Sequence, residues 1–341
     1  MQSFWVYLKK FFLFFLVISS LRPSAQGNTN GYLSFEYKKG QSQADVSHGS
    51  FQNAQAGIIF SGRIAAKIDY ISEIRLTEES QVELNQALVA FQASTSFNLS
   101  LGLYLVPFGK YNQSNRPHQT MLINEPLNVE KMFPSSWRDI GILLEGRIGS
   151  FFYSTYLGNG LSESENLSTA QQFRDNNVDK GKGGRVGLAL SQWIEVAYSY
   201  FSGKYDEDNS RDLVLQGADL IWSARTFQVL AEYSRALLDN PEGLGSGKTE
   251  GYFVQFSFDI AALRPIVSYQ KISYEDVFHG PGFINPDIPG AGISEKRSRW
   301  SLGFVYFASQ NFLLKFEYDF NREKDLELKD NSFSFQAALS F

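Results

Sequence analysis

The chain has no cysteine among its 341 residues, and it has only three histidines. An exported protein of this size without cysteine has neither disulfide bonds nor thiolate metal sites, so its order must come from backbone pairing and packing. His48, His118 and His279 fall in predicted loops, and none stands beside a serine of matching parity on a strand. A base and its nucleophile need such proximity. The sequence therefore predicts no catalytic residue.

Metal-binding and cofactor-binding patterns are equally scarce. The chain contains no HExxH pattern and no EF-hand loop, and the glycines at 181–184 lack the spacing of a phosphate-binding loop. The acidic stretches 206–208 and 323–330 could hold a divalent cation loosely, although solvated charge runs are favoured. We expect no metal and no cofactor.

Long apolar runs are missing, with one exception at the N-terminus. Lys9 and Lys10 precede the apolar run 11–18, and the small residues Ser24 and Ala25 follow it. This order predicts a cleaved signal peptide over residues 1–25, because a membrane anchor would need about 20 apolar residues. No other stretch is apolar over a spanning length, which excludes a helical membrane protein and leaves residues 26–341 as one mature domain.

Positive charge is in deficit. The sequence has 31 Lys and Arg residues against 36 Asp and Glu residues. Removal of Lys9, Lys10 and Arg22 with the signal peptide leaves 28 against 36, a net charge of −8. An acidic exported chain is a poor nucleic-acid binder, because phosphates are held by Lys and Arg. Aromatic residues make up 15% of the chain, as suits a lipid-facing wall with aromatic girdles.

The last ten residues, 332–341, alternate in polarity. Apolar residues occupy one parity: Phe333, Phe335, Ala337, Leu339 and Phe341. The other parity carries Ser332, Ser334, Gln336, Ala338 and Ser340. An extended strand places alternate side chains on opposite faces. A transmembrane barrel between lipid and water produces this pattern, and so does a half-buried strand of a soluble sheet.

Sixteen alternating segments follow the signal peptide, each near the roughly 10 residues that a tilted strand needs to cross a bilayer. They are residues 31–38, 54–61, 63–76, 81–92, 96–106, 137–148, 151–158, 183–190, 193–202, 211–222, 225–235, 250–260, 263–273, 297–307, 311–320 and 332–341. The segments 81–92 and 151–158 alternate poorly and cannot be oriented. The fold predicted is an all-β, antiparallel transmembrane β-barrel.

The connections between these segments alternate between short and long. Short turns are predicted at 61–62, 93–95, 149–150, 191–192, 223–224, 261–262 and 308–310. Long loops are predicted at 39–53, 107–136, 159–182, 236–249, 274–296 and 321–331, with shorter ones at 77–80 and 203–210. Short periplasmic turns and long extracellular loops are typical of transmembrane barrels, and a soluble sandwich does not require this rhythm.

Charged residues fall on a single parity within each predicted strand. A charge facing lipid at the midplane would cost about 2–4 kcal/mol, so the charged face must look inward onto water. The predicted lumen-lining charges include Arg63, Lys67, Asp69, Glu73, Arg75, Glu145, Arg147, Arg185, Arg297, Arg299, Lys315 and Glu317. Cations and carboxylates nearly balance, which predicts a mixed wall and no strong sieve for one sign.

Four elements of the sequence carry a family resemblance. They are Pro107-Phe108-Gly109 after a strand, Arg116-Pro117-His118, the strand re-entry Phe133-Pro134-Ser135-Ser136-Trp137-Arg138-Asp139-Ile140-Gly141, and Asp175-Asn176-Asn177-Val178-Asp179-Lys180 before Gly184-Arg185-Val186. On these elements, about a fifth of the chain, the protein resembles Gram-negative porins of the phosphate-selective porin O and P superfamily. The resemblance implies a sixteen-stranded barrel, commonly trimeric, whose third outer loop folds into the lumen.

The loop 107–136 would be this constriction loop. A loop of about 30 residues without regular structure is uncommon and usually functional. Its candidate constriction residues are Lys110, Arg116, Glu125, Glu130, Lys131 and Arg138. An outer lid or a trimer contact is the alternative interpretation of the loop.

The function predicted is that of a general outer-membrane porin for passive diffusion of small hydrophilic solutes and ions. An anion- or phosphate-type channel that uses Lys110, Arg116 and Lys131 is the first alternative. A barrel-based enzyme or adhesin is the second. The expected partners are outer-membrane lipid and lipopolysaccharide, the other subunits of a homotrimer, and the barrel-assembly machinery, which would engage the strand ending in Phe341. The expected location is the outer membrane of a Gram-negative bacterium.

Overall fold

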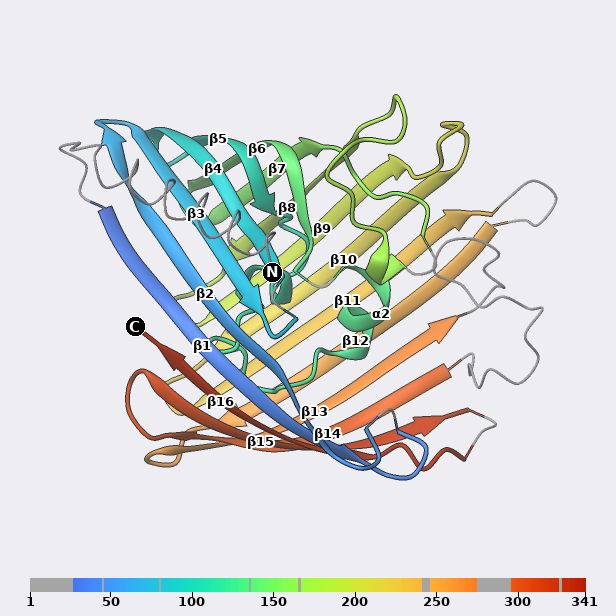
Figure 1. Cartoon of the computed structure of the whole chain (residues 1–341). Helices are drawn as coiled ribbons and strands as arrows, with labels where there is room; N and C mark the ends of the chain where they lie inside the picture. The colour runs from blue at the N-terminus through green and yellow to red at the C-terminus, as the bar shows by residue number, and fades with distance from the viewer. Residues whose placement is uncertain are drawn as a thin grey trace, which may run out of the picture.

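The computed structural model describes residues 27–44, 46–79, 81–134, 136–164, 167–240, 246–274, 296–324 and 327–341. The described residues form a closed antiparallel barrel of sixteen strands, in which β1 pairs with β16 (Figure 1). The strands are β1 Gly27–Gly40, β2 Ser50–Ala65, β3 Ile68–Thr77, β4 Val82–Ser94, β5 Phe97–Leu105, β6 Arg138–Ile148, β7 Phe151–Gly158, β8 Gly181–Ala189, β9 Ile194–Lys204, β10 Asp212–Ser223, β11 Phe227–Asp239, β12 Ser246–Phe258, β13 Leu263–Tyr274, β14 Lys296–Phe307, β15 Phe312–Glu323 and β16 Ser332–Ser340. The predicted fold class is confirmed.

Large apolar side chains cover the outside of the barrel at alternate positions. In β16, Phe333 is 37% exposed, whereas its neighbour Ser334 is 1% exposed on the inside. In β14, Trp300, Leu302 and Phe304 are exposed, and Ser301 between them is buried. The period of two residues along each strand therefore separates an apolar outer wall from a polar inner wall.

The position of one turn was predicted wrongly. The sequence suggested a turn at residues 61–62, but β2 continues to Ala65 and the turn lies at 66–67. Arg63 and Asp69 face each other across this hairpin and form an exposed ion pair of 2.7 Å. Lys67, predicted to face the lumen from a strand, instead lies exposed in this turn.

The poor alternation of β4 has a structural cause. The pairing of β3 with β4 shifts register between Glu73 and Ile74, and Asn85 is the extra residue on β4. A β-bulge of this kind reverses the parity of the strand beyond it. Leu84 is therefore exposed before the bulge, and Val89 and Phe91 are exposed after it.

Several strands run beyond the segments that alternation predicted. β11 ends at Asp239 and β12 begins at Ser246, so the connection predicted at 236–249 is mostly strand. The predicted signal peptide, most of the connection 274–296 and His279 lie outside the described residues. In the described part of the chain, no helix combines the length and the apolar character needed to cross a membrane.

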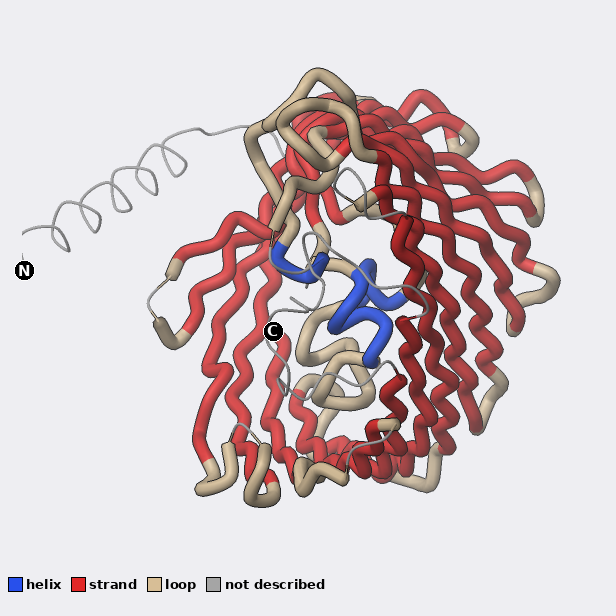
Figure 2. The backbone as a smooth tube through the Cα atoms, turned by 90° about the vertical axis from the view of Figure 1, so that its right-hand side faces the viewer, coloured by secondary structure: helices blue, strands red, loops and turns tan. Residues whose placement is uncertain are grey.

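In the described connections, three short helices are present. η1, Tyr111–Ser114, and α2, Leu127–Met132, belong to the loop between β5 and β6. η2, Leu167–Thr169, belongs to the connection between β7 and β8. Figure 2 shows the β5–β6 loop and its helices enclosed by the ring of strands.

Candidate channel and its inner loop

The first part of loop 107–136 is attached to the wall formed by β9 and β11. The amide of Gly109 donates to Ser199 Oγ at 3.1 Å. The amides of Lys110 and Tyr111 both donate to Glu232 Oε2, at 2.9 and 3.0 Å. Gly109 has a φ of +64°, and a side chain there would collide with the Glu232 carboxylate. The loop therefore requires glycine at the point where it enters the lumen.

An apolar cluster fills the lumen beside β5 to β13. Phe108, Phe133 and Trp137 from the loop and its re-entry are almost completely buried, and Phe201 from β9 packs on Trp137 at a ring-centroid distance of 5.2 Å. The rings of Phe133 and Trp137 are nearly parallel, 6.1 Å apart. Leu127 and Met132 of α2 belong to the same cluster. This side of the lumen is packed like a protein core.

The middle of the loop is attached to β3 through an ion pair. Arg116 donates to both oxygens of Glu73, with Nη2 to Oε2 at 2.6 Å. Glu73 is completely buried, and Tyr32 Oη on β1 also donates to it at 3.1 Å. The ring of His118 lies 5.2 Å from that of Tyr32. Burial, with the charges of Arg116 and Lys315, lowers the pKa of His118 to about 4.

The next part of the loop is attached to β15. Glu317 Oε2 accepts hydrogen bonds from the amides of Ile123, at 2.5 Å, and Asn124, at 3.1 Å. The side chain of Asn124 donates to Asp319 at 2.9 Å, and its oxygen accepts a hydrogen bond from Lys38 at 3.1 Å. The loop thus reaches strands that lie almost 200 positions further along the chain.

Helix α2 is the last attachment, against β11 to β14. The Leu127 amide donates to Gln270 at 3.0 Å, and Arg299 of β14 donates to the Glu125 carbonyl oxygen at 3.1 Å. Arg299 also lies 3.3 Å from Glu130, which contacts Lys131 at 2.7 Å. Burial opposes the charge of Glu130, but the two cations outweigh it and hold the pKa of Glu130 below its ordinary value.

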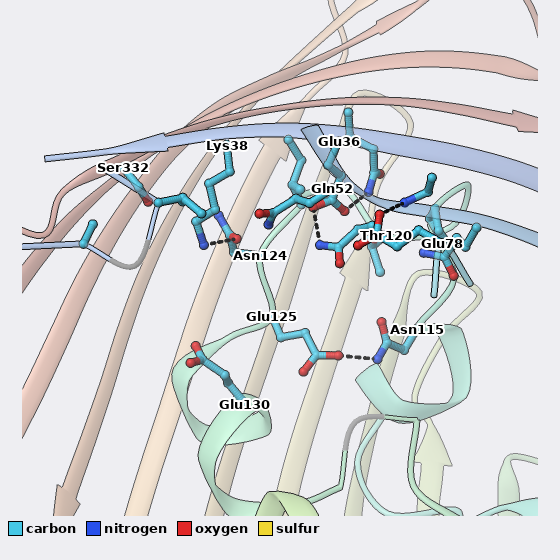
Figure 3. Close-up of a pocket in the computed structure, with 18 of the residues that line it drawn as sticks. Glu36, Lys38, Gln52, Glu78, Asn115, Thr120, Asn124, Glu125, Glu130 and Ser332 are labelled. Atoms are coloured by element: carbon cyan, nitrogen blue, oxygen red, sulfur yellow. Dashed lines mark hydrogen bonds between the residues drawn. The ribbon is translucent and has the colours of Figure 1, made fainter. Parts of the chain in front are cut away.

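Opposite the apolar cluster, a polar cavity of about 960 Å³ separates the loop from the barrel wall (Figure 3). Its strand side is formed by β1 to β3 and β14 to β16, and its loop side by residues between Asn115 and Ser136. Among the residues that the structure describes, five cations line it: Lys38, Arg75, Lys131, Arg297 and Arg299. The carboxylates of this described lining are Glu36, Glu78, Glu79, Glu125, Glu130 and Asp330. It also includes nine Asn and Gln side chains.

The six candidate constriction residues occupy two kinds of position. Glu125, Glu130 and Lys131 line the cavity. Arg116 is attached to Glu73, and Lys110 lies at the Glu232 attachment; neither is part of the cavity lining. 

Arg138 is the sixth candidate, and it also lies away from the cavity. Its guanidinium donates to the Leu84 carbonyl oxygen at 3.0 Å and lies 5.3 Å from the Phe173 ring centre. It therefore packs against the start of β4 and the β7–β8 connection.

The predicted lumen-lining charges have several roles. Arg75, Arg297 and Arg299 line the cavity, whereas Glu73 and Glu317 bind the loop. Lys315 is buried and donates to Thr120 Oγ1 of the loop at 3.0 Å. Away from the cavity, Arg185 pairs with Asp219 and Glu195, Glu145 accepts from Ser154, Arg147 lies over Phe152, and Arg63 pairs with Asp69.

Sequence reasoning missed part of the cavity lining. Glu36 and Lys38 share the inner parity of β1, a signal that the alternation of that strand already contained. Glu78 and Glu79 lie in the turn after β3, and turn residues have no parity that would place them on the lumen side. Among the described residues, no three His, Cys, Asp or Glu side chains are grouped as metal ligands would be.

The structure resembles solved outer-membrane channels. The channel DcaP of Acinetobacter baumannii matches with a TM-score of 0.68 at 13% identity, over 93% of this chain and 97% of DcaP. OmpF of Salmonella typhi, in a complex with daunomycin, gives 0.68 at 12% identity, over 92% and 97% of the two chains. An anion-selective porin from Comamonas acidovorans gives 0.67 at 12% identity, over 93% and 100%. These similarities show the fold of outer-membrane porins.

Similarity in sequence is weaker. No family model matches the chain. An uncharacterized protein of Aquifex aeolicus strain VF5 is 22% identical over 295 residues, which cover 77% of this chain and 66% of the relative. The chain therefore spans slightly less than two thirds of that relative's length.

Proposed function

We propose that this chain is an outer-membrane porin through which small hydrophilic solutes and ions diffuse passively. One observation carries the proposal: a polar cavity of about 960 Å³ lies inside a closed barrel whose outer wall is apolar. A closed barrel leaves no unpaired strand edge in lipid, and a polar interior supplies a hydrated path. The loop 107–136 narrows this path by filling one side of the lumen.

The rest of the proposal concerns location and assembly. Residues 1–25 direct export, and the barrel is inserted in the outer membrane among lipid and lipopolysaccharide. The protein assembles as a homotrimer, and the barrel-assembly machinery recognises the strand that ends in Phe341. Resemblance to the phosphate-selective porin O and P superfamily supports these points through the elements around 107–141.

The anion-channel alternative would use Lys110, Arg116 and Lys131. Arg116 contacts Glu73 at 2.6 Å, and Lys131 contacts Glu130 at 2.7 Å. Lys110 is not part of the cavity lining. A cation that already holds a carboxylate attracts a passing anion weakly, so these contacts favour the general pore over the anion channel.

Planar lipid bilayers test the proposed function directly. The purified full-length mature protein, added to a bilayer in potassium chloride, should produce stepwise increases in conductance. Proteoliposomes should also swell in small sugars, since an uncharged hydrophilic solute that fits the pore diffuses through it without a specific binding site. A protein that is folded by circular dichroism and gives neither conductance nor swelling would contradict the proposal.

A further inference from the structure

The polar cavity between loop 107–136 and the wall formed by β14 to β16 and β1 to β3 is called the passage below. Its described lining has more carboxylates without a cation partner than cations without a carboxylate partner. The opposite side of the lumen is filled by the apolar cluster around Phe108, Phe133 and Trp137. A solute that enters this cavity therefore meets a charged and amide-rich wall. The charges of this wall that remain without a partner decide which solutes it favours.

Most cations in the cavity lining are neutralised by carboxylates. Arg75 pairs with Glu83 at 2.5 Å, and Arg297 pairs with Glu323 at 3.0 Å; neither carboxylate is part of the lining. Lys131 contacts Glu130, and Arg299 lies between Glu130 at 3.3 Å and Asp319 at 3.9 Å, so two carboxylates balance these two cations. 

Lys38 differs from the other four lining cations. Within the described part of the chain, no carboxylate lies within 4.0 Å of its amine, which donates instead to Asn124. Lys38 is therefore the one lining cation whose charge is not balanced by a direct ion pair among these residues.

Three carboxylates of the lining are held by amides and not by cations. Glu36 accepts from Asn53 at 2.8 Å and from Gln336 at 2.6 Å. Glu78 accepts from the Ala54 amide at 2.9 Å, and Glu79 accepts from Gln81 at 2.8 Å. Over the described residues, no Lys, Arg or His side chain pairs with any of the three. Amide donors stabilise a carboxylate without cancelling its charge.

The arrangement of these groups makes the passage electronegative. Glu36 and Glu78 lie on the strand side, and Glu125 and Glu130 lie on the loop side (Figure 3). Nine Asn and Gln side chains supply neutral oxygen acceptors between them, and no aromatic ring of the described residues lines the cavity. Carbonyl and carboxylate oxygens are acceptors for ammonium groups. Because the described lining has no aromatic ring, it offers no surface on which a sugar ring could stack.

We propose that this passage favours small cations, and in particular solutes with an ammonium group, over anions of similar size. The proposal rests on the proposed function, because it assigns the solute class of the same channel. Glu36, Glu78 and Glu79 supply the attraction and outnumber Lys38, the one unpaired cation of the described lining, while the paired cations contribute little repulsion. This preference is opposite to the one that the phosphate-porin resemblance would suggest.

The test is the reversal potential of the mature protein in a planar bilayer under a potassium chloride gradient. The wild type should pass potassium in preference to chloride. The double variant E78Q/E79Q, which alters two exposed turn residues, should lower the potassium-to-chloride permeability ratio at least about twofold. E36Q should lower it as well.

The matched control is E207Q/D208N, which removes two exposed loop carboxylates that do not line the cavity. It should leave the permeability ratio unchanged. In proteoliposomes, lysine should enter faster than glutamate, and E78Q/E79Q should reduce this difference. Heat-dependent mobility on a denaturing gel checks that each variant is folded.

The outcomes separate this inference from the proposed function. Conductance with a ratio below one, or an equal shift in both double variants, overturns the cation preference and leaves the porin function standing. Glutamate entry as fast as lysine entry also overturns it. Absence of any conductance overturns the proposed function and, with it, the preference.

Discussion

At the scale of single residues, His118 shows how the loop interior suppresses a charge. Its ring packs beside Tyr32, and its buried Nδ1 has no hydrogen-bond partner among the residues that the structure describes. Burial, together with the neighbouring Arg116 and Lys315, lowers the pKa of His118 to about 4. The imidazole is therefore neutral at neutral pH, and it adds no positive charge to the loop that faces the passage.

This depressed pKa predicts a pH dependence of stability. The unfolded chain protonates His118 near its ordinary value of 6.5, whereas the folded protein resists protonation until about pH 4. Stability should thus be unaffected by His118 above pH 6.5 and should fall as the pH drops from 6.5 towards 4. Melting in detergent, followed by circular dichroism, should show a smaller acid loss for His118→Gln than for the wild type.

The control for this measurement is His48→Gln, because His48 is an exposed loop residue. Its acid loss should equal that of the wild type. Parallel stability curves for His118→Gln and the wild type would contradict the prediction.

At the scale of elements, loop 107–136 is held by carboxylates of the strands. The loop has little regular structure, so its buried amides need acceptors from elsewhere. Glu232 and Glu317 each accept two consecutive loop amides, and Glu73 binds Arg116 through both oxygens. All three carboxylates are at least 97% buried, which makes these attachments strong and specific.

The attachment at Glu73 can be measured. Arg116→Ala leaves a buried carboxylate without its partner, and we expect a loss of about 3–5 kcal/mol in the free energy of unfolding. Addition of Glu73→Gln to the same chain should recover more than half of it, because the charge is then removed. Urea unfolding in detergent gives the free energies for this double-mutant cycle.

The exposed pair of Arg63 and Asp69 is the control for the cycle. Arg63 is 55% exposed, so Arg63→Ala should cost less than about 1 kcal/mol. Equal losses for Arg116→Ala and Arg63→Ala would show that the loop attachment is not a buried ion pair.

At the scale of the whole molecule, closure of the barrel depends on its two terminal strands. β1 and β16 pair from Tyr32 with Ser340 to Gly40 with Ser332. Gly31 and Phe341 exchange two backbone hydrogen bonds, of 2.9 and 3.0 Å, just beyond this ladder. Phe341 remains 58% exposed as a residue. Backbone pairing closes the sheet, and the terminal ring is left for other contacts.

Because the backbone of Phe341 closes the sheet and its side chain is exposed, loss of the side chain should affect folding of the purified protein and assembly in the cell differently. Phe341→Ala keeps the backbone bonds, so the purified variant should fold in detergent as the wild type does. Because we propose that the assembly machinery reads the terminal strand, the variant should accumulate less in the outer membrane of expressing cells. Membrane fractionation and immunoblotting measure this. Phe333→Ala, also an exposed aromatic of β16, is the control, and equal accumulation of both variants would contradict the prediction.

The number of strands was predictable because the alternation of apolar and polar side chains is a property of each strand's own sequence. Phe333 and Ser334, or Trp300 and Ser301, reveal by their own alternation which side faces lipid. The alternation of polarity misled where local geometry breaks the period, at the bulge of Asn85, and where β2 continues past the turn predicted at 61–62 to pair with β3 as far as Ala65. No single strand contains the information that decides either case.

The sequence by itself determined a sixteen-stranded wall with an apolar and a polar face, because neighbouring residues on an extended chain point to opposite solvents. Only the tertiary structure decided which charges remain free to meet a solute. Arg116 is occupied by Glu73, and Asn124 is bound to Asp319, 195 positions away. Such pairs join a loop to strands that are distant in sequence. They form only because the folded loop crosses the lumen and brings the two partners together.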